Sequence, residues 1–234
     1  MVRPRPALCW LPTAVEAAVL LARGDSDAAA PAIDAAAAIG GDLGVAGAEA
    51  TAASQRMLLM MLNGTFGSLA TLLESTFDPL HTRNDIMAVY GLACAQVGEI
   101  STARRVAEAL ASRPCLLRPA GITWPLVAMA AAELAWASGD AALGSRVCDE
   151  LSGWSGWGLS MYGVAYLGAA DTWLALAAAA MGHDRAAAEL LRSAASQEER
   201  RGAVPWHARA LEAAADLSSR TIGSGGYVGR RWST

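Results

Sequence analysis

The sequence contains no lysine, so all 18 of its Lys and Arg positions are arginine. A P-loop for nucleotide phosphates ends in Gly-Lys-Ser/Thr, and this chain therefore cannot contain one. The arginines are outnumbered by 22 acidic residues, and the formal net charge is −4. A nucleic-acid-binding surface needs clustered positive charge, so we expect no direct contact with nucleic acid.

Cysteine is also scarce, with Cys9, Cys94, Cys115 and Cys148 as the full set. None of them forms a CxxC pair, and no histidine cluster accompanies them. Disulfide scaffolds are usually shorter and richer in cysteine, and structural zinc sites need closely spaced ligands. We expect free, mostly buried thiols in a cytoplasmic protein that has no metal and no cofactor.

A secretory or membrane segment is not expected either. The basic start of the chain is followed by Glu16 and Arg23, which leave no uninterrupted apolar stretch for a signal peptide. Residues 156–182 are long enough to span a membrane, but Asp171 in their middle would cost about 2.5–3.5 kcal/mol on insertion. We expect a buried helix there and no membrane partner.

Runs of β-branched residues are absent, whereas alanine is abundant, with 54 Ala against 6 Ile. Alanine has the highest helix propensity of all residues, and glycine has the lowest apart from proline. Alanine-rich stretches alternate with short breaks that carry glycine. The composition therefore predicts an all-α chain.

Five of these glycines recur at spacings of 40, 34, 41 and 43 residues: Gly24, Gly64, Gly98, Gly139 and Gly182. The residue three positions before each is apolar, the residue five positions after is small in four of the five, and the residue nine positions after is apolar. This pattern predicts helix, glycine turn, helix, with the glycine as a left-handed cap. An Asp or Thr after the glycine can cap the next helix.

A period of this length, built from helix pairs, is typical of an α-solenoid. We expect antiparallel helix pairs stacked as a tetratricopeptide-like array of about 11 helices. The predicted helices are 13–23, 26–39, 45–62, 66–77, 84–97, 101–112, 122–138, 141–151, 160–181, 184–201 and 204–218. Residues 1–12 are expected to be an N-terminal extension, 13–218 the repeat domain and 219–234 a flexible tail.

The stretch 84–217 contains strings such as YGLACAQVGEISTARRVAEAL and, at 202–209, Gly-Ala-x-Pro-Trp-x-Ala-Arg. In these strings it resembles the tetratricopeptide-like C-terminal region of bacterial LuxR-type, MalT-like and ATPase- or cyclase-linked transcriptional regulators. Without a P-loop or a basic recognition helix, the ATPase and DNA-binding activities of these regulators do not carry over. The resemblance implies a sensing and interaction module.

The densest aromatic region surrounds residues 154–173, and a packed loop is its simplest interpretation. It is also our candidate ligand- or partner-binding site, with these residues: Trp124, Trp154, Trp157, Tyr162, Tyr166 and Asp171. Glu133 and Asp171 are acids within apolar helices, where a general acid or a ligand contact is one hypothesis. The resemblance to the regulators implies structural pairing instead. The histidines His81, His183 and His207 have no evident catalytic partner in the sequence.

The sequence thus predicts a non-catalytic, regulatory binding module that holds a protein partner or a small inducer on its concave face. The alternative is an enzyme or small-molecule-binding protein with an aromatic pocket inside the helical scaffold. Self-association into a homodimer is a further hypothesis, since weakly charged helix faces favour it.

Overall fold

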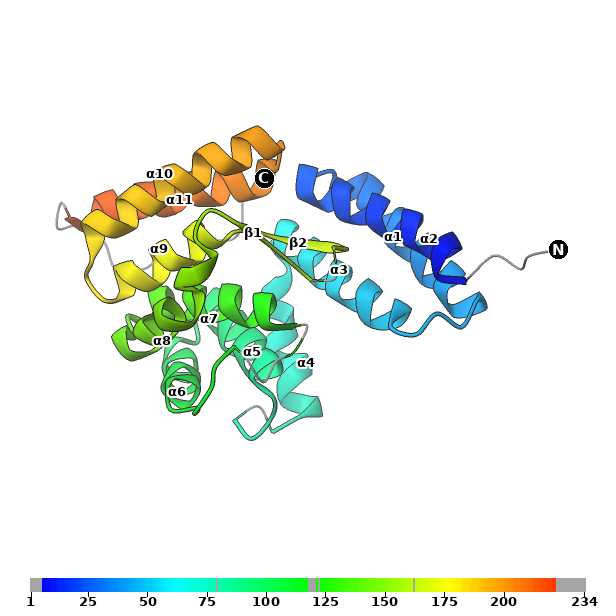
Figure 1. Ribbon diagram of the computed structural model, residues 1–234. Helices are drawn as coiled ribbons and strands as arrows, with labels where there is room; N and C mark the ends of the chain where they lie inside the picture. Colours follow the sequence, from blue (N-terminus) through cyan, green and yellow to red (C-terminus); the bar gives the residue numbers. More distant parts are fainter. Residues whose placement is uncertain (1–5, 79, 118–120, 122, 162, 222–234) are drawn as a thin grey trace.

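The computed structural model describes residues 6–78, 80–117, 121, 123–161 and 163–221, and this part of the chain is mostly helical. Its eleven α-helices confirm the all-α expectation, with a small two-stranded sheet as an addition (Figure 1). The helices are α1 (Pro6–Arg23), α2 (Ser26–Asp42), α3 (Ala48–Leu62), α4 (Leu69–Thr76), α5 (Asn84–Gln96), α6 (Ile100–Ala111), α7 (Trp124–Ser138), α8 (Ala141–Leu151), α9 (Ala170–Ala180), α10 (Asp184–Arg201) and α11 (Val204–Thr221). Short 3-10 turns lie at Phe66–Ser68 (η1) and Ser152–Trp154 (η3). Within the described residues, no helix is both long and apolar enough to cross a membrane.

The glycine turns form as the repeat predicts. All five repeat glycines have positive φ, between 66° and 83°, which L-residues with a side chain rarely adopt. The carboxylates of Asp25 and Asp140 accept hydrogen bonds from the backbone N–H groups of Ala28 and Leu143, so they cap α2 and α8. At Gly144, an added Cβ would lie 2.6 Å from the Ala177 carbonyl oxygen, which shows how closely α8 approaches α9.

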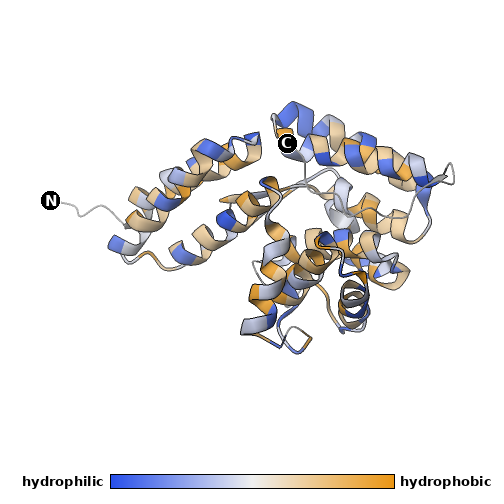
Figure 2. Ribbon diagram, turned by 180° about the vertical axis from the view of Figure 1, so that it is seen from behind, coloured by the Kyte–Doolittle hydropathy of each residue, from blue (hydrophilic) through white to orange (hydrophobic). Residues whose placement is uncertain are grey.

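Helices α5 to α9 stack in two rows. Helices α5, α7 and α9 pack side by side in the inner row, and α6 packs against α8 in the outer row. The inner helices are buried along almost their whole length, whereas α6 and α8 bury one face and expose the other. Helix α10 has the most hydrophilic sequence of the helices described, and Figure 2 colours the ribbon by this property. This layering explains why alanine dominates α7 and α9, since only small side chains allow neighbours on every side.

The predicted helix 160–181 is wrong over its first ten residues. Residues Gly158–Met161 (β1) and Ala165–Ala169 (β2) form an antiparallel hairpin instead, and α9 begins at Ala170. Gly156, Gly163 and Gly168 all have positive φ, which interrupts a helix. A two-stranded hairpin is marginal alone. This one is stabilised by burial, because β2 packs against α1, α3, α7 and α10.

The two ends of the helical array meet above the hairpin (Figure 1). Helix α1 contacts α11, and a Cβ added to Gly24 would lie 3.1 Å from Cγ of Pro205. Helix α1 begins at Pro6 rather than at residue 13, and α11 extends to Thr221. Residues 222–234, most of the expected tail, lie outside the described residues.

A buried ion pair connects α7 to α11. Both carboxylate oxygens of Glu133 accept hydrogen bonds from the Arg209 guanidinium, each at 2.6 Å. Both residues are at least nine-tenths buried. Structural pairing of Glu133 is thus confirmed, and the pair fixes the last helix across the inner face of α7.

Loss of one member of this pair leaves the other charge buried without its partner. We predict that Arg209→Met lowers the free energy of unfolding by about 3–5 kcal/mol, measured by urea denaturation. The matched control is Arg185→Met, because Arg185 forms an exposed pair with Glu189 on α10 and should cost less than about 1 kcal/mol. Equal effects of the two substitutions would contradict this account.

Candidate functional site

Two tryptophans stand exposed in the turn between α8 and β1. Trp154 is 44% exposed and Trp157 is 66% exposed, although tryptophan is usually largely buried. The Trp154 ring packs against Trp124 at the start of α7, with ring centroids 4.8 Å apart and planes tilted by 38°. The backbone of Trp157 is fixed on both sides, since its N–H donates to Trp154 and its carbonyl accepts from Ala170. The turn therefore presents indole rings on a constrained backbone.

The buried side chain of Asp171, at the start of α9, holds this turn by hydrogen bonds. Its Oδ1 accepts hydrogen bonds from the Ser155 hydroxyl at 2.8 Å and from the Gly156 N–H at 3.0 Å. Its Oδ2 accepts from Ser193 at 2.8 Å and from Gln197 at 2.7 Å, both on α10. The side chain is 2% exposed, so it faces the protein interior and not solvent. Structural pairing of Asp171 is confirmed, and the residue positions the segment between the two tryptophans.

Tyr166 on β2 belongs to a separate cluster on α10. Its hydroxyl donates to the Glu198 carboxylate, with both oxygens 2.9 Å away, and accepts from Arg201 at 3.2 Å. Burial raises the pKa of the Glu198 carboxyl, and burial beside that carboxylate also raises the pKa of the Tyr166 phenol. A phenol held in its protonated form is a hydrogen-bond donor here and not a nucleophile.

The structure brings together some of the predicted site residues and separates others. The rings of Trp124 and Trp154 are in contact, Trp157 is exposed three residues further along the same turn, and Asp171 binds the two residues between Trp154 and Trp157. Tyr166 lies behind the turn, where its ring packs against Gly158. Tyr162 lies outside the described residues.

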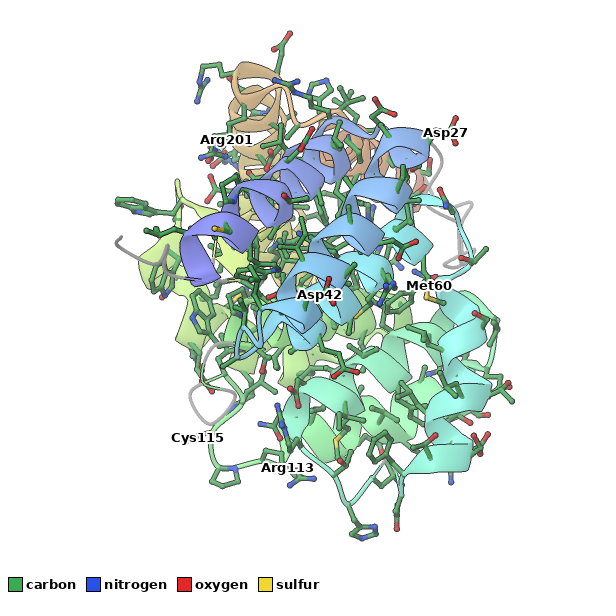
Figure 3. All side chains as sticks on the ribbon, turned by 90° about the vertical axis from the view of Figure 1, so that its right-hand side faces the viewer. Asp27, Asp42, Met60, Arg113, Cys115 and Arg201 are labelled. Carbon is green, nitrogen blue, oxygen red and sulfur yellow. The ribbon has the colours of Figure 1, made fainter. Side chains whose placement is uncertain are left out.

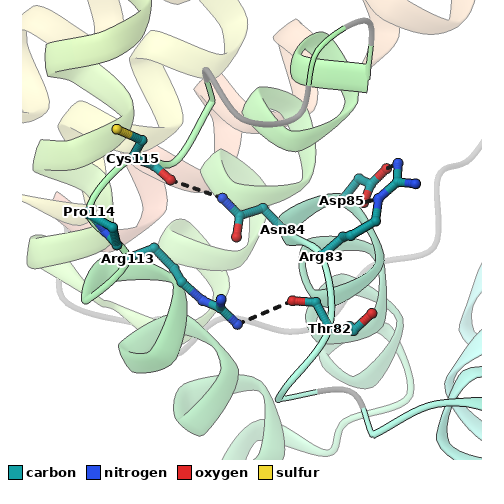
Figure 4. Close-up of a pocket in the computed structure, with 7 residues that line it drawn as sticks. All are labelled: Thr82, Arg83, Asn84, Asp85, Arg113, Pro114 and Cys115. Carbon is teal, nitrogen blue, oxygen red and sulfur yellow. Dashed lines mark hydrogen bonds and ion pairs between the residues drawn. The ribbon is translucent and has the colours of Figure 1, made fainter.

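Sequence reasoning did not single out a cavity of about 490 Å³ at the start of α5 (Figure 4). Seven residues line it: Thr82, Arg83, Asn84, Asp85, Arg113, Pro114 and Cys115. Their polar groups hold the surrounding loops. Arg83 pairs with Asp85, Asn84 donates to the Cys115 carbonyl, and Arg113 donates to the Thr82 carbonyl. The polar string at 82–85 was a signal for this feature, but the contacts assign these side chains to loop structure.

The remaining candidates carry no evident chemistry. Cys94 is buried, but Cys9 and Cys115 are exposed, so the expectation of mostly buried thiols holds only in part. His81 pairs with Asp78 on the surface, and Nδ1 of His207 contacts the Ala195 carbonyl. Among the described residues, no group of three or more His, Cys, Asp and Glu side chains is arranged to hold a metal ion.

Comparisons with family models, with curated proteins and with solved structures found no significant match. The resemblance to the C-terminal region of LuxR-type and MalT-like regulators therefore stays a prediction.

We name residues 154–157, between α8 and β1, the tryptophan turn. We predict that Asp171→Asn releases this turn from α9. The amide retains one acceptor oxygen and turns an N–H₂ group toward donors, so the free energy of unfolding should fall by about 3 kcal/mol. The emission of the exposed tryptophans should also change under native conditions. Asp149→Asn on the exposed face of α8 is the control and should change neither. Native emission and stability equal to the wild type in Asp171→Asn would contradict the anchoring role.

The raised pKa of Glu198 gives a defined pH dependence. The folded state keeps the proton at pH values where the unfolded chain has lost it, so the linked stability is complete below about pH 4.5 and declines as the pH rises through the folded pKa. The free energy of unfolding of the wild type relative to Glu198→Gln should therefore fall as the pH rises above about 4.5, measured by urea denaturation. The matched control is Glu189→Gln, at an exposed position of α10, which should change the free energy of unfolding by less than about 1 kcal/mol. A wild-type advantage over Glu198→Gln that grows with pH would contradict the assignment.

Proposed function

We propose that this chain is a non-catalytic binding module with a regulatory role in the cytoplasm, built on a tetratricopeptide-like stack of helix pairs. The glycine-capped helix pairs and the two rows formed by α5 to α9 support the repeat architecture. The resemblance of residues 84–217 to the interaction region of bacterial regulators supports the regulatory role.

The buried ionisable groups support a binding role over a catalytic one. The oxygens of Asp171 accept four hydrogen bonds, Glu133 pairs with Arg209, and Glu198 accepts from Tyr166. Each group is engaged by the protein itself, whereas a general acid or base must reach the substrate. The enzyme or small-molecule alternative would need Asp171 to line one cavity together with the aromatic rings. Instead, both Asp171 oxygens are engaged by hydrogen bonds from the turn and from α10.

The exposed tryptophan turn carries the proposal. Trp154 and Trp157 lose the stabilisation that burial would give them. The backbone is nevertheless constrained, because Asp171 accepts from the Gly156 N–H between them and the Trp157 carbonyl accepts from the Ala170 N–H. Tryptophan is enriched among the residues that dominate binding energy at protein interfaces, and a constrained backbone reduces the entropy lost on binding. The partner on this surface is a protein segment that supplies an apolar or aromatic side chain.

This placement differs from the concave face that the repeat pattern suggests. In the described part of the chain, the hairpin packs against α7. Helix α11 also reaches α7, through the Arg209–Glu133 pair and through Arg220 over the Trp136 ring. The chain itself therefore covers part of the inner row of helices. A small inducer on a remaining part of the concave face stays a prediction.

A displayed library of random peptides tests the proposal, because such a library requires no identified partner. Peptides selected on the wild-type chain should share an aromatic or apolar anchor. Their affinity should drop at least 10-fold on Trp157→Ala, because truncation of a central interface tryptophan costs about 2 kcal/mol or more. Leu72→Ala, an exposed substitution on α4, should leave the affinity unchanged. Selected peptides that bind Trp157→Ala as tightly as the wild type would contradict the proposal.

A further inference from the structure

The outer face of α1 is apolar where it meets solvent. Leu8, Leu11, Val15 and Val19 are between 38% and 66% exposed. Their spacings of three, four and four residues place them in one line along the helix. We name these four residues the α1 stripe. Helix α1 lies beside α2 at the front of the view in Figure 3, with its opposite face packed on the rest of the chain.

A surface helix of a soluble protein normally has polar residues on its exposed face. Within α1 the charged residues are Glu16 and Arg23, so the α1 stripe has few charges beside it. Contiguous exposed apolar patches of several hundred Å² mark interaction sites. A membrane-surface helix would instead combine such a stripe with many basic residues on its polar face. The chemistry of this face fits another apolar protein surface.

We propose that the α1 stripe pairs with the α1 stripe of a second copy of this chain, antiparallel and about a two-fold axis. The stripe is self-complementary about its midpoint, between residues 13 and 14. In the pair, Leu8 faces Val19 of the other copy and Leu11 faces its Val15, so each large side chain meets a smaller one. In a two-fold symmetric (isologous) interface, the same patch of the two copies meets, so the patch must be complementary to itself. A partner of another kind would not require the patch to be self-complementary.

The size of the stripe sets the strength of the pairing. An 18-residue helix is about 27 Å long and about 10 Å wide, which gives a footprint of a few hundred Å² per copy. A stable dimer usually buries about 800 Å² per partner. The pairing is therefore weak, with a dissociation constant on the order of 0.1 mM. Self-association should depend on concentration, and dilute samples should be monomeric.

Sedimentation of the full chain from about 10 µM to about 1 mM tests the proposal. The wild type should shift from monomer to dimer across this range. Val15→Glu places two carboxylates near the axis of each dimer and should weaken association at least about 100-fold. Val15→Arg should do the same, and an equimolar mixture of the two variants should dimerise again, which separates an interface effect from misfolding.

Two controls keep this test distinct from the proposed function. Leu72→Glu, at another exposed helix position, and Trp157→Ala, in the tryptophan turn, should dimerise like the wild type. A wild type that stays monomeric at 1 mM would overturn the proposal, as would a dimer that survives Val15→Glu or dissociates on Trp157→Ala. Binding of the monomer to vesicles of phosphatidylglycerol, lost on Val15→Glu, would assign the stripe to a lipid surface instead and also overturn it.

Discussion

The arrangement around the hairpin depends on the carboxylate of Asp171. One side chain at the start of α9 accepts hydrogen bonds from the turn before β1 and from α10. It thereby joins segments that lie on either side of α9 in the sequence. Because the carboxylate is buried, loss of any one donor would leave part of a buried polar group unsatisfied, which costs free energy.

The hairpin forms hydrogen bonds with the N-terminal helices and with α10. At its tip, the Val164 carbonyl accepts a hydrogen bond from the buried Gln55 amide, which also donates to Ala14 on α1. Two residues further along the hairpin, Tyr166 reaches Glu198 on α10. The hairpin therefore connects the N-terminal helices to the last helix pair, and together with the contact of α1 with α11 it brings the two ends of the array together.

Local physics explains which features the sequence predicts. The repeat glycines and the caps at Asp25 and Asp140 each depend on neighbours within a few positions, so their pattern indicates their structure. The hairpin depends on burial against α1, α3 and α10, which no local pattern shows, and its alanine and leucine content favoured a helix. Asp171 stood out as a charge in an apolar segment, but its partners Ser193 and Gln197 lie a full helix away. The density of aromatic residues in the sequence pointed to this region. Only the structure shows that Trp157 is exposed, whereas Tyr166 is half-buried and bonded to Glu198.

Hydrogen exchange at the Gly156 amide tests the central claim most directly. This N–H belongs to an exposed turn, but its acceptor is the buried carboxylate of Asp171. If Asp171 holds the tryptophan surface in place, the Gly156 amide exchanges slowly, on the scale of the buried amides of α9, and its protection disappears in Asp171→Asn. Exchange at the rate of an unstructured loop in the wild type would show that the turn is not anchored, and it would contradict the account of a preorganised binding surface.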